Sequence, residues 1–192
     1  MPSSQGMITV VTGLPRSGTS MMMHMLEAGG MPILTDNIRK PDEDNPNGYY
    51  EFEAVKQLSR NSSWLAGASG KAVKMVYRLL YELPTEYRYG VIFLERKLDE
   101  VLASQLVMLG RNREQQSPAD NLRLAASFRR ELERTKSWLR AQNNFKVLDL
   151  SYNNVIDYPE SSAEVIERFL GVGLDRQAMI QVVDSTLYRQ RS

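Results

Sequence analysis

The sequence contains no cysteine and a single histidine, and its charges nearly cancel, with 24 Lys and Arg against 23 Asp and Glu. The missing cysteine excludes disulfide bonds, thiolate zinc sites, iron–sulfur centres and a cysteine nucleophile. A formal net charge of +1 gives no overall basic field of the kind that draws a protein to nucleic acid. We therefore expect no nucleic-acid partner, and any anionic ligand must be held by a local cluster of side chains.

Long apolar runs are absent as well. No stretch of about 18 consecutive apolar residues occurs, so no membrane span is expected. The first residues, MPSSQGMITVV, lack the charged and apolar regions of a secretion signal, which favours a cytoplasmic protein. Residues 1–192 suit a single domain with a real core, and residues 1–6, which are small and polar, are expected to be a flexible lead-in.

Short apolar runs alternate with segments of helical pattern. The runs typical of buried strands are 7–12, 71–77, 90–95 and 145–150. The longest predicted helix is 118–141, with Ser117 as its cap, Pro118 at its first position and an apolar stripe of Leu124, Phe128, Leu132 and Leu139. Such alternation implies right-handed crossovers and a mostly parallel sheet covered by helices on both faces. The predicted class is α/β with three layers, and residues 30–50 form a long connection.

Residues 13–20, GLPRSGTS, have the spacing of a P-loop and stand between the first predicted strand and a helix. Successive backbone N–H groups and a helix N-terminus form a nest for an anion, and glycines let the backbone approach a phosphate closely. Ser17, Thr19 and Ser20 add three hydroxyls. The sequence therefore predicts a phosphate-binding loop at the head of a P-loop fold.

The loop departs from that of nucleoside triphosphatases. The position after its second glycine, where those proteins carry lysine, is Thr19, and the cation of the loop is Arg16. A kinase acting on ATP would need both the lysine and a Mg²⁺ site. A P-loop nucleotide or small-molecule kinase remains an alternative, because Asp149 near the end of the last predicted strand offers a carboxylate for such a metal.

The segment PRSGTS after a strand resembles the loop of sulfotransferases that binds the 5′-phosphosulfate of 3′-phosphoadenosine 5′-phosphosulfate (PAPS). The resemblance continues in VIFLERKLDEVLAS, which is similar to the family's second cofactor motif. It also includes LSYNNVIDYPESSAEVIERFLG and, as in bacterial members, NPNGYYEFEAV. The matching pieces extend from about residue 8 to about residue 190. The sequence is thus identified as similar to the PAPS-dependent sulfotransferase family.

The resemblance implies a set of ligand-binding residues. It places the 5′-phosphosulfate against the loop and the 3′-phosphate against Arg96 and Ser104, with Tyr152 near the adenine. The loop residues implied are Pro15, Arg16, Ser17, Gly18, Thr19 and Ser20. The family's glycine-rich phosphate loop near the C-terminus is missing in its usual form, and Arg189 or Arg191 are its candidate substitutes.

The implied reaction moves the sulfuryl group of PAPS to a hydroxyl or amine and leaves PAP, without a metal. Arg16 would neutralise charge on the bridging oxygen as the bond breaks. An acceptor hydroxyl must also lose a proton, and Glu51 is the preferred base. Asp36, Glu53 and His24 are the alternatives. Lys74 is set aside, because the sequence around it, KMVYRLL, lacks the aspartate and proline that follow the lysine in many bacterial relatives.

Two questions stay open at this point. The chain could be a non-catalytic relative that binds PAP or PAPS without turnover. The acceptor, a small molecule or a glycan, would be held by variable loops at 30–60 and 108–120. Their surroundings offer four aromatic residues that suit an apolar acceptor but can equally cover the core: Tyr49, Tyr50, Phe52 and Trp64.

Overall fold

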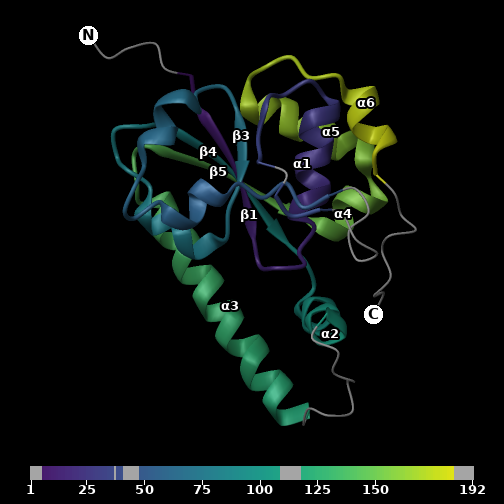
Figure 1. Ribbon diagram of the computed structural model, residues 1–192. Coiled ribbons are helices and arrows are strands. Elements are labelled where there is room, and N and C mark those ends of the chain that lie inside the picture. Colours follow the sequence, from purple (N-terminus) through teal and green to yellow (C-terminus); the bar gives the residue numbers. More distant parts are fainter. Residues whose placement is uncertain (1–5, 37, 41–47, 109–117, 184–192) are drawn as a thin grey trace.

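The structure is a computed structural model that describes residues 6–36, 38–40, 48–108 and 118–183. A five-stranded sheet with the order β2-β3-β1-β4-β5 forms its centre, and every neighbouring pair of strands is parallel (Figure 1). The strands are β1 (Ile8–Gly13), β2 (Ile33–Leu34), β3 (Ala72–Lys74), β4 (Tyr89–Glu95) and β5 (Phe145–Ser151). The predicted α/β class with a parallel sheet is confirmed.

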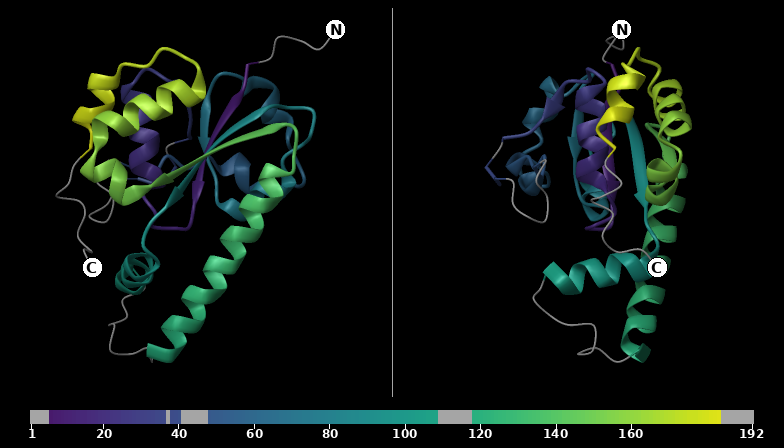
Figure 2. Two further views of the ribbon diagram at one scale, coloured as in Figure 1. Left: turned by 180° about the vertical axis from the view of Figure 1, so that it is seen from behind. Right: turned by 90° about the vertical axis from the view of Figure 1, so that its right-hand side faces the viewer.

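Helices cover both faces of the sheet (Figures 1 and 2). The α-helices are α1 (Thr19–Ala28), α2 (Leu98–Met108), α3 (Pro118–Arg140), α4 (Tyr152–Asp157), α5 (Pro159–Leu170) and α6 (Arg176–Gln181). Short 3₁₀-helices occupy η1 (Glu53–Gln57), η2 (Ser63–Gly67) and η3 (Tyr77–Glu82). One hydrophobic cluster packs α1, α4, α5 and α6 on one face, and the other packs α3 and the 3₁₀-helices on the opposite face. The result is three layers.

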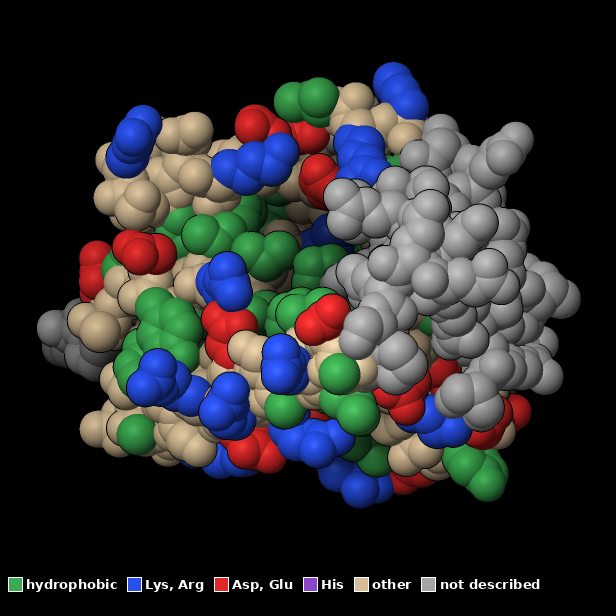
Figure 3. All heavy atoms as spheres, turned by 90° about the horizontal axis from the view of Figure 1, so that it is seen from below, with side chains coloured by type: hydrophobic (Ala, Val, Ile, Leu, Met, Phe, Trp, Pro, Cys, Tyr) green, Lys and Arg blue, Asp and Glu red, His purple; other side chains and the backbone are tan. Residues whose placement is uncertain are grey.

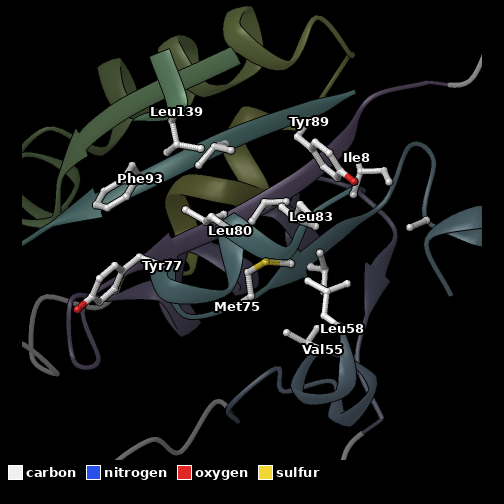
Figure 4. Packing of buried hydrophobic residues seen from close by; sticks show 14 of the residues in the cluster. Ile8, Val55, Leu58, Met75, Tyr77, Leu80, Leu83, Tyr89, Phe93 and Leu139 are labelled. Atoms are coloured by element: carbon white, nitrogen blue, oxygen red, sulfur yellow. The ribbon is translucent and has the colours of Figure 1, made fainter. Parts of the chain in front are cut away.

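Alternating side chains of the strands divide the core into these two clusters. In β1, Val10 faces the 3₁₀-helices and α3, whereas Val11 faces α1. In β4, Phe93 lies on the same face as Val10, and Ile92 lies on the same face as Val11. All four side chains are fully buried. Figure 4 shows the cluster on the side of α3, which combines buried side chains of η1, η3, β4 and α3. Because both faces are covered, these strands are continuous apolar runs in the sequence.

One predicted strand is longer than the observed one, and one observed strand was not predicted. The strand expected at 71–77 ends at Lys74, because the chain turns into η3 at Tyr77. The connection expected at 30–50 contains β2, a two-residue edge strand paired with β3. Two residues give no periodicity, so the sequence pattern could not reveal it.

The long helix α3 follows the prediction, except in its apolar stripe. Leu132 and Leu139 are buried and Phe128 is partly buried, but Leu124 is 37% exposed. The N-terminal part of α3 extends beyond the sheet, alongside α2 (Figures 1 and 2). Periodicity marks the apolar side of a helix but not how much of its length lies over the core. The expected cap, Ser117, lies outside the described residues.

The order of the strands places the carboxyl ends of β1 and β4 at a switch point. From β1 the chain crosses to β2 and β3 on one side, and from β4 it continues to β5 on the other. In open parallel sheets, ligands bind in the crevice outside the strand ends where the connections diverge in this way. None of the helices in the described part of the chain combines the length and the apolar character that a bilayer span requires.

Candidate functional site

The loop from Gly13 to Ser20 connects β1 to α1, as the sequence predicts. Two of its residues adopt left-handed backbone conformations: Gly18 has φ 90° and Arg16 has φ 74°. Such values are unfavourable for a side-chain-bearing residue, so the loop holds Arg16 in a strained conformation. Strain of this kind is typical of ligand-binding loops.

Tyr152 closes one side of the loop. It begins α4, directly after β5, and its ring packs against Gly18, where a Cβ atom would lie 2.2 Å from Tyr152 Cδ2. The guanidinium of Arg96 stacks over the same ring at 4.7 Å. Burial raises the pKa of the Tyr152 hydroxyl, so this group stays neutral at physiological pH. Loop, arginine and tyrosine therefore form one packed unit.

The two arginines predicted to bind phosphate meet at this loop. Arg96 Nη1 donates to the backbone carbonyl of Arg16 at 3.3 Å, and Arg16 Nε donates to Ser104 Oγ at 2.9 Å. Ser104 is buried on α2, eight positions after Arg96. The structure thus brings the two predicted motifs together, although 88 positions separate Arg16 from Ser104.

Ser17 lies behind the loop. Its Oγ is buried and has no hydrogen-bond partner among the described residues, and its backbone N–H donates to the carbonyl of Leu14 at 3.1 Å. A Cβ atom at Gly13 would approach this oxygen to 2.4 Å, so the serine fills the space beneath the glycine. Its part in holding a ligand stays a prediction.

Lys74 ends β3 beside the loop. It donates hydrogen bonds to Ser20 Oγ at 3.2 Å and to the backbone carbonyl of Tyr49. Burial lowers the pKa of Lys74 to about 8, an effect that Arg39 reinforces and the Glu51 carboxylate opposes. Its signal in the sequence is a lysine within the apolar run 71–77, but the residues after it depart from the pattern of the family that the sequence resembles.

One cavity of about 510 Å³ opens beside these residues at the carboxyl ends of β1, β3 and β4. Most residues predicted for the site line it, namely Pro15, Arg16, Gly18, Thr19, Ser20, His24, Glu51, Arg96 and Tyr152. Lys74 and Arg39 line it too, and neither was predicted. Ser17 and Ser104 do not.

The wall of the cavity opposite the loop is apolar. It consists of residues from η1 and the position before it, from the chain between β3 and η3, and from η3: Phe52, Val55, Met75, Val76 and Leu79. Val76 lines the cavity and is 46% exposed. Seen from below, apolar side chains lie within a hollow bordered by charged ones (Figure 3). The cavity therefore has a cationic, hydroxyl-rich side and an apolar side.

The candidate bases differ in their positions. Glu51 lines the cavity and pairs with Arg39 at 2.9 Å. His24 lines it as well, with its ring stacked on Tyr50 at 6.3 Å. Asp36 does not line it, and the backbone N–H groups of Glu53 and Ile38 that donate to its carboxylate lower its pKa. Glu53 pairs with Lys56 at 2.7 Å. Only Glu51 and His24 therefore face the cavity.

The four aromatic residues near the cavity have different tasks. Phe52 lines the cavity and packs edge-on against Trp64 at 5.5 Å, which supports it from behind. Tyr49 is buried under Arg39, whose guanidinium lies 3.3 Å from the ring centroid. Tyr50 donates to Glu27 on α1 at 2.6 Å. Phe52 is thus the aromatic residue that offers its side chain to the apolar wall.

Asp149, the carboxylate that kept a metal-dependent kinase in view, is engaged elsewhere. It pairs with Lys136 at 2.9 Å and with Arg140, both on α3, and it does not line the cavity. Its charge is balanced by two cations at the edge of the sheet. The arrangement therefore argues against Asp149 as a metal ligand at the loop. The candidates Arg189 and Arg191 lie outside the described residues.

Solved sulfotransferases share this fold. STF1 from Mycobacterium tuberculosis superposes with a TM-score of 0.58 at 21% identity, over 92% of this chain and 71% of STF1. Mouse SULT7A1, complexed with PAP, gives 0.57 at 19% identity over 96% of this chain and 64% of the mouse chain. The sulfotransferase domain of the Synechococcus olefin synthase gives 0.55 at 15%, over 98% and 82%. Neither a protein-family model nor a curated protein matches the sequence. The chain thus has the sulfotransferase fold.

Proposed function

We propose that this chain is a sulfotransferase that moves the sulfuryl group of PAPS to a hydroxyl or amine of an acceptor and releases PAP. The observation that carries the proposal is the convergence of three cations, Arg16, Arg96 and Lys74, on one cavity at the switch point of this fold. The loop itself supports it, because it leads directly into the N-terminus of α1, where backbone N–H groups favour an anion. That mouse SULT7A1 was solved with PAP supports the choice of nucleotide.

Each residue has a distinct task in this proposal. Thr19, Ser20 and the loop backbone hold the 5′-phosphate at the N-terminus of α1. Arg96, with Ser104 behind Arg16, lies on the side of the 3′-phosphate, and Tyr152 borders the adenine. PAPS supplies a sulfuryl group on a good leaving group. Arg16 and Lys74 neutralise the charge that grows on the bridging oxygen as its bond to sulfur breaks.

The acceptor oxygen gains the new bond to sulfur and loses its proton. Glu51 is our choice of base, because it is the carboxylate among the residues that line the cavity. For the Glu51 carboxylate to take a proton, its ion pair with Arg39 must open, or one of its two oxygens must stay free of Arg39. That pairing is also the observation that favours the second candidate function, a non-catalytic PAP or PAPS binder. Neither proposal requires a metal.

The apolar wall favours one class of acceptor. Phe52, Val55, Val76 and Leu79 offer an acceptor few hydrogen-bonding partners, whereas a glycan needs many. We therefore propose a small apolar alcohol, phenol or amine in place of a glycan, with its reactive group toward Glu51 and Lys74 and its apolar body against this wall.

Calorimetric titration tests the nucleotide, with PAP, ADP, and ATP plus Mg²⁺ in the same buffer. We expect metal-independent binding of PAP that is at least tenfold tighter than that of ADP. PAP formation from PAPS is then followed with a panel of apolar alcohols and phenols beside simple sugars. Preference for ATP with Mg²⁺, or no binding of PAP, would overturn the sulfotransferase proposal. Tight PAP binding without turnover on the whole panel would favour the non-catalytic binder.

The depressed pKa of Lys74 predicts how the reaction depends on pH. A lysine is cationic below its pKa, so with a pKa of about 8 the stabilising charge is present at pH 7 and is lost as pH rises through 8. We expect the rate of PAP formation to fall about tenfold per pH unit well above 8. In Lys74→Arg the cation persists, and the decline should move beyond pH 10.

The matched control is Lys71→Arg, at a lysine just before the same strand that does not line the cavity. It should keep the wild-type profile. A decline near pH 8 that survives in Lys74→Arg would show that another group titrates there.

A further inference from the structure

Glu100 is a buried carboxylate for which the proposed reaction has no use. It lies in the first turn of α2 and is 1% exposed. Its Oε2 accepts a hydrogen bond from Arg96 Nε at 2.8 Å, and its Oε1 accepts one from Asn153 Nδ2 at 3.3 Å. Lys97 Nζ approaches to 4.0 Å from the solvent side. One carboxylate therefore joins the end of β4 to the start of α4.

Stability alone is a poor reason for this arrangement. The side chains of Arg96 and Glu100 are 8% and 1% exposed, so both ions have left water almost completely. The cost of removing two ions from water roughly cancels their attraction, and well-packed apolar residues often serve stability as well. A buried pair of this kind does, however, fix direction, because its hydrogen bonds demand one geometry.

The buried pair fixes the orientation of the Arg96 guanidinium. Its Nε is held by Glu100, its face rests on the Tyr152 ring at 4.7 Å, and its Nη1 reaches the carbonyl of Arg16 at 3.3 Å. These contacts set the plane of the fork and the edge that it turns to the cavity, which Arg96 lines. A planar fork recognises phosphate only when that edge is correctly aimed.

The Glu100 carboxylate also holds the turn that carries Tyr152, whose ring supports the Arg96 guanidinium. Asn153 follows Tyr152 directly, so its hydrogen bond to Glu100 anchors the turn that carries the Tyr152 ring. That ring packs on Gly18 of the loop. Glu100 thus lies behind both Arg96 and Tyr152 and is not among the residues that line the cavity.

We propose that Glu100 is a positioning residue, which orients Arg96 and Tyr152 and thereby makes the cavity prefer a nucleotide with a 3′-phosphate over the same nucleotide without one. The proposal rests on the function proposed above, in which Arg96 faces that phosphate. Without Glu100, Arg96 keeps its charge, but its guanidinium is no longer held in one orientation. The selectivity of the site should therefore suffer more than its general affinity for nucleotides.

The experiment measures the Kd of PAP and of AMP, which is PAP without its 3′-phosphate, by calorimetry for the wild type, Glu100→Gln and Glu100→Asp. We expect both variants to reduce the PAP-over-AMP preference about tenfold, with less than about threefold change in the Kd of AMP. Glu100→Asp keeps the negative charge but shortens the side chain by one methylene, so it tests the orientation of Arg96 separately from the charge. Circular dichroism and thermal unfolding establish that each variant is folded, and either variant alone suffices for the test.

Asp149→Asn is the matched control. It removes a carboxylate from another ion pair, with Lys136, at a place outside the cavity. We expect it to lower stability while the preference for PAP keeps its wild-type value. Loss of preference in this control as well would mean that the selectivity follows stability and would overturn the proposal.

A double-variant cycle with Arg96 tests the path of the effect. In an Arg96→Ala background, Glu100→Gln should cause no further loss of preference, because the preference for the 3′-phosphate depends on Arg96. Additive losses would overturn the proposal, as would full wild-type preference in Glu100→Gln. A wild-type protein that shows no preference for PAP would instead overturn the proposed function, so the two failures are distinguishable.

Discussion

Arg16→Ala is expected to lower the rate of PAP formation by about 10²- to 10³-fold at saturating PAPS. Arg16 lines the cavity, and its Nε is held by Ser104 Oγ at 2.9 Å, which aims the guanidinium. Charge builds on the bridging oxygen only as its bond to sulfur breaks, so a cation placed there stabilises the transition state more than the bound substrate. The Kd of PAP should therefore change by less than about tenfold. Both quantities are measured, by steady-state kinetics and by calorimetry.

Alanine keeps the backbone strain of the loop comparable, because the φ of 74° at this position is unfavourable for any residue with a Cβ atom. Arg130→Ala provides the control, since it removes an exposed arginine of α3 that does not line the cavity. It should leave both quantities within about twofold of the wild type. A loss of PAP affinity in Arg16→Ala that is as large as the loss in rate would assign Arg16 to ground-state binding and contradict its role in bond cleavage.

The strands and the loop were predictable because local patterns specify them. The apolar runs of β1 and β4 are buried on both faces, and β5 at the edge of the sheet is partly buried on both. Such strands form continuous apolar runs that can be recognised in the sequence. The loop follows β1 within a few residues, and its glycines stand at the positions that the turn requires. The relation between Arg16 and Arg96 was also accessible, because both follow strands and the carboxyl ends of parallel strands meet at one edge.

Lys74 and the apolar wall could not be predicted with the same assurance. Lys74 ends a three-residue strand, and one of its partners is the backbone carbonyl of Tyr49, which carries no signature in the sequence. Val76 and Leu79 look like core residues, but the turn into η3 brings them to the wall of the cavity. The role of Glu100 could not be predicted from the sequence for a related reason. Its i,i+4 spacing from Arg96 is typical of exposed helical pairs, and burial depends on how α2 and α4 pack.

These cases share a physical cause. A motif predicts which backbone atoms and charged groups can hold a ligand, because it specifies local geometry. The support behind the motif comes from contacts between segments that are distant in the chain, such as Asn153 with Glu100 or Tyr152 with Gly18. Those contacts are set by the packing of the sheet and helices. The loop can therefore be recognised in a single sequence, whereas the side chains that aim its ligand partners require the structure.

Gly18→Ala is expected to weaken PAP binding at least tenfold more than Gly30→Ala does. The two glycines have nearly the same left-handed backbone, with φ 90° and 91°, so alanine meets the same backbone strain at both. A Cβ atom at position 18 would lie 2.2 Å from Tyr152 Cδ2, whereas one at position 30 meets nothing within 4 Å. Overpacking of this kind costs about 1–3 kcal/mol, and 1.4 kcal/mol corresponds to a tenfold change in affinity.

The clash also predicts how the effect is relieved. Alanine at position 18 must push away the Tyr152 ring on which the Arg96 guanidinium rests, so it disturbs both sides of the nucleotide site at once. In a Tyr152→Leu background the smaller side chain leaves room, and Gly18→Ala should then reduce the free energy of unfolding by no more than Gly30→Ala does in the same background. Calorimetry of PAP binding and chemical unfolding of the four variants measure both effects. Equal losses for the two glycines with Tyr152 in place would mean that the ring does not pack on the loop in solution, and the closed side of the site would have to be assigned to another residue.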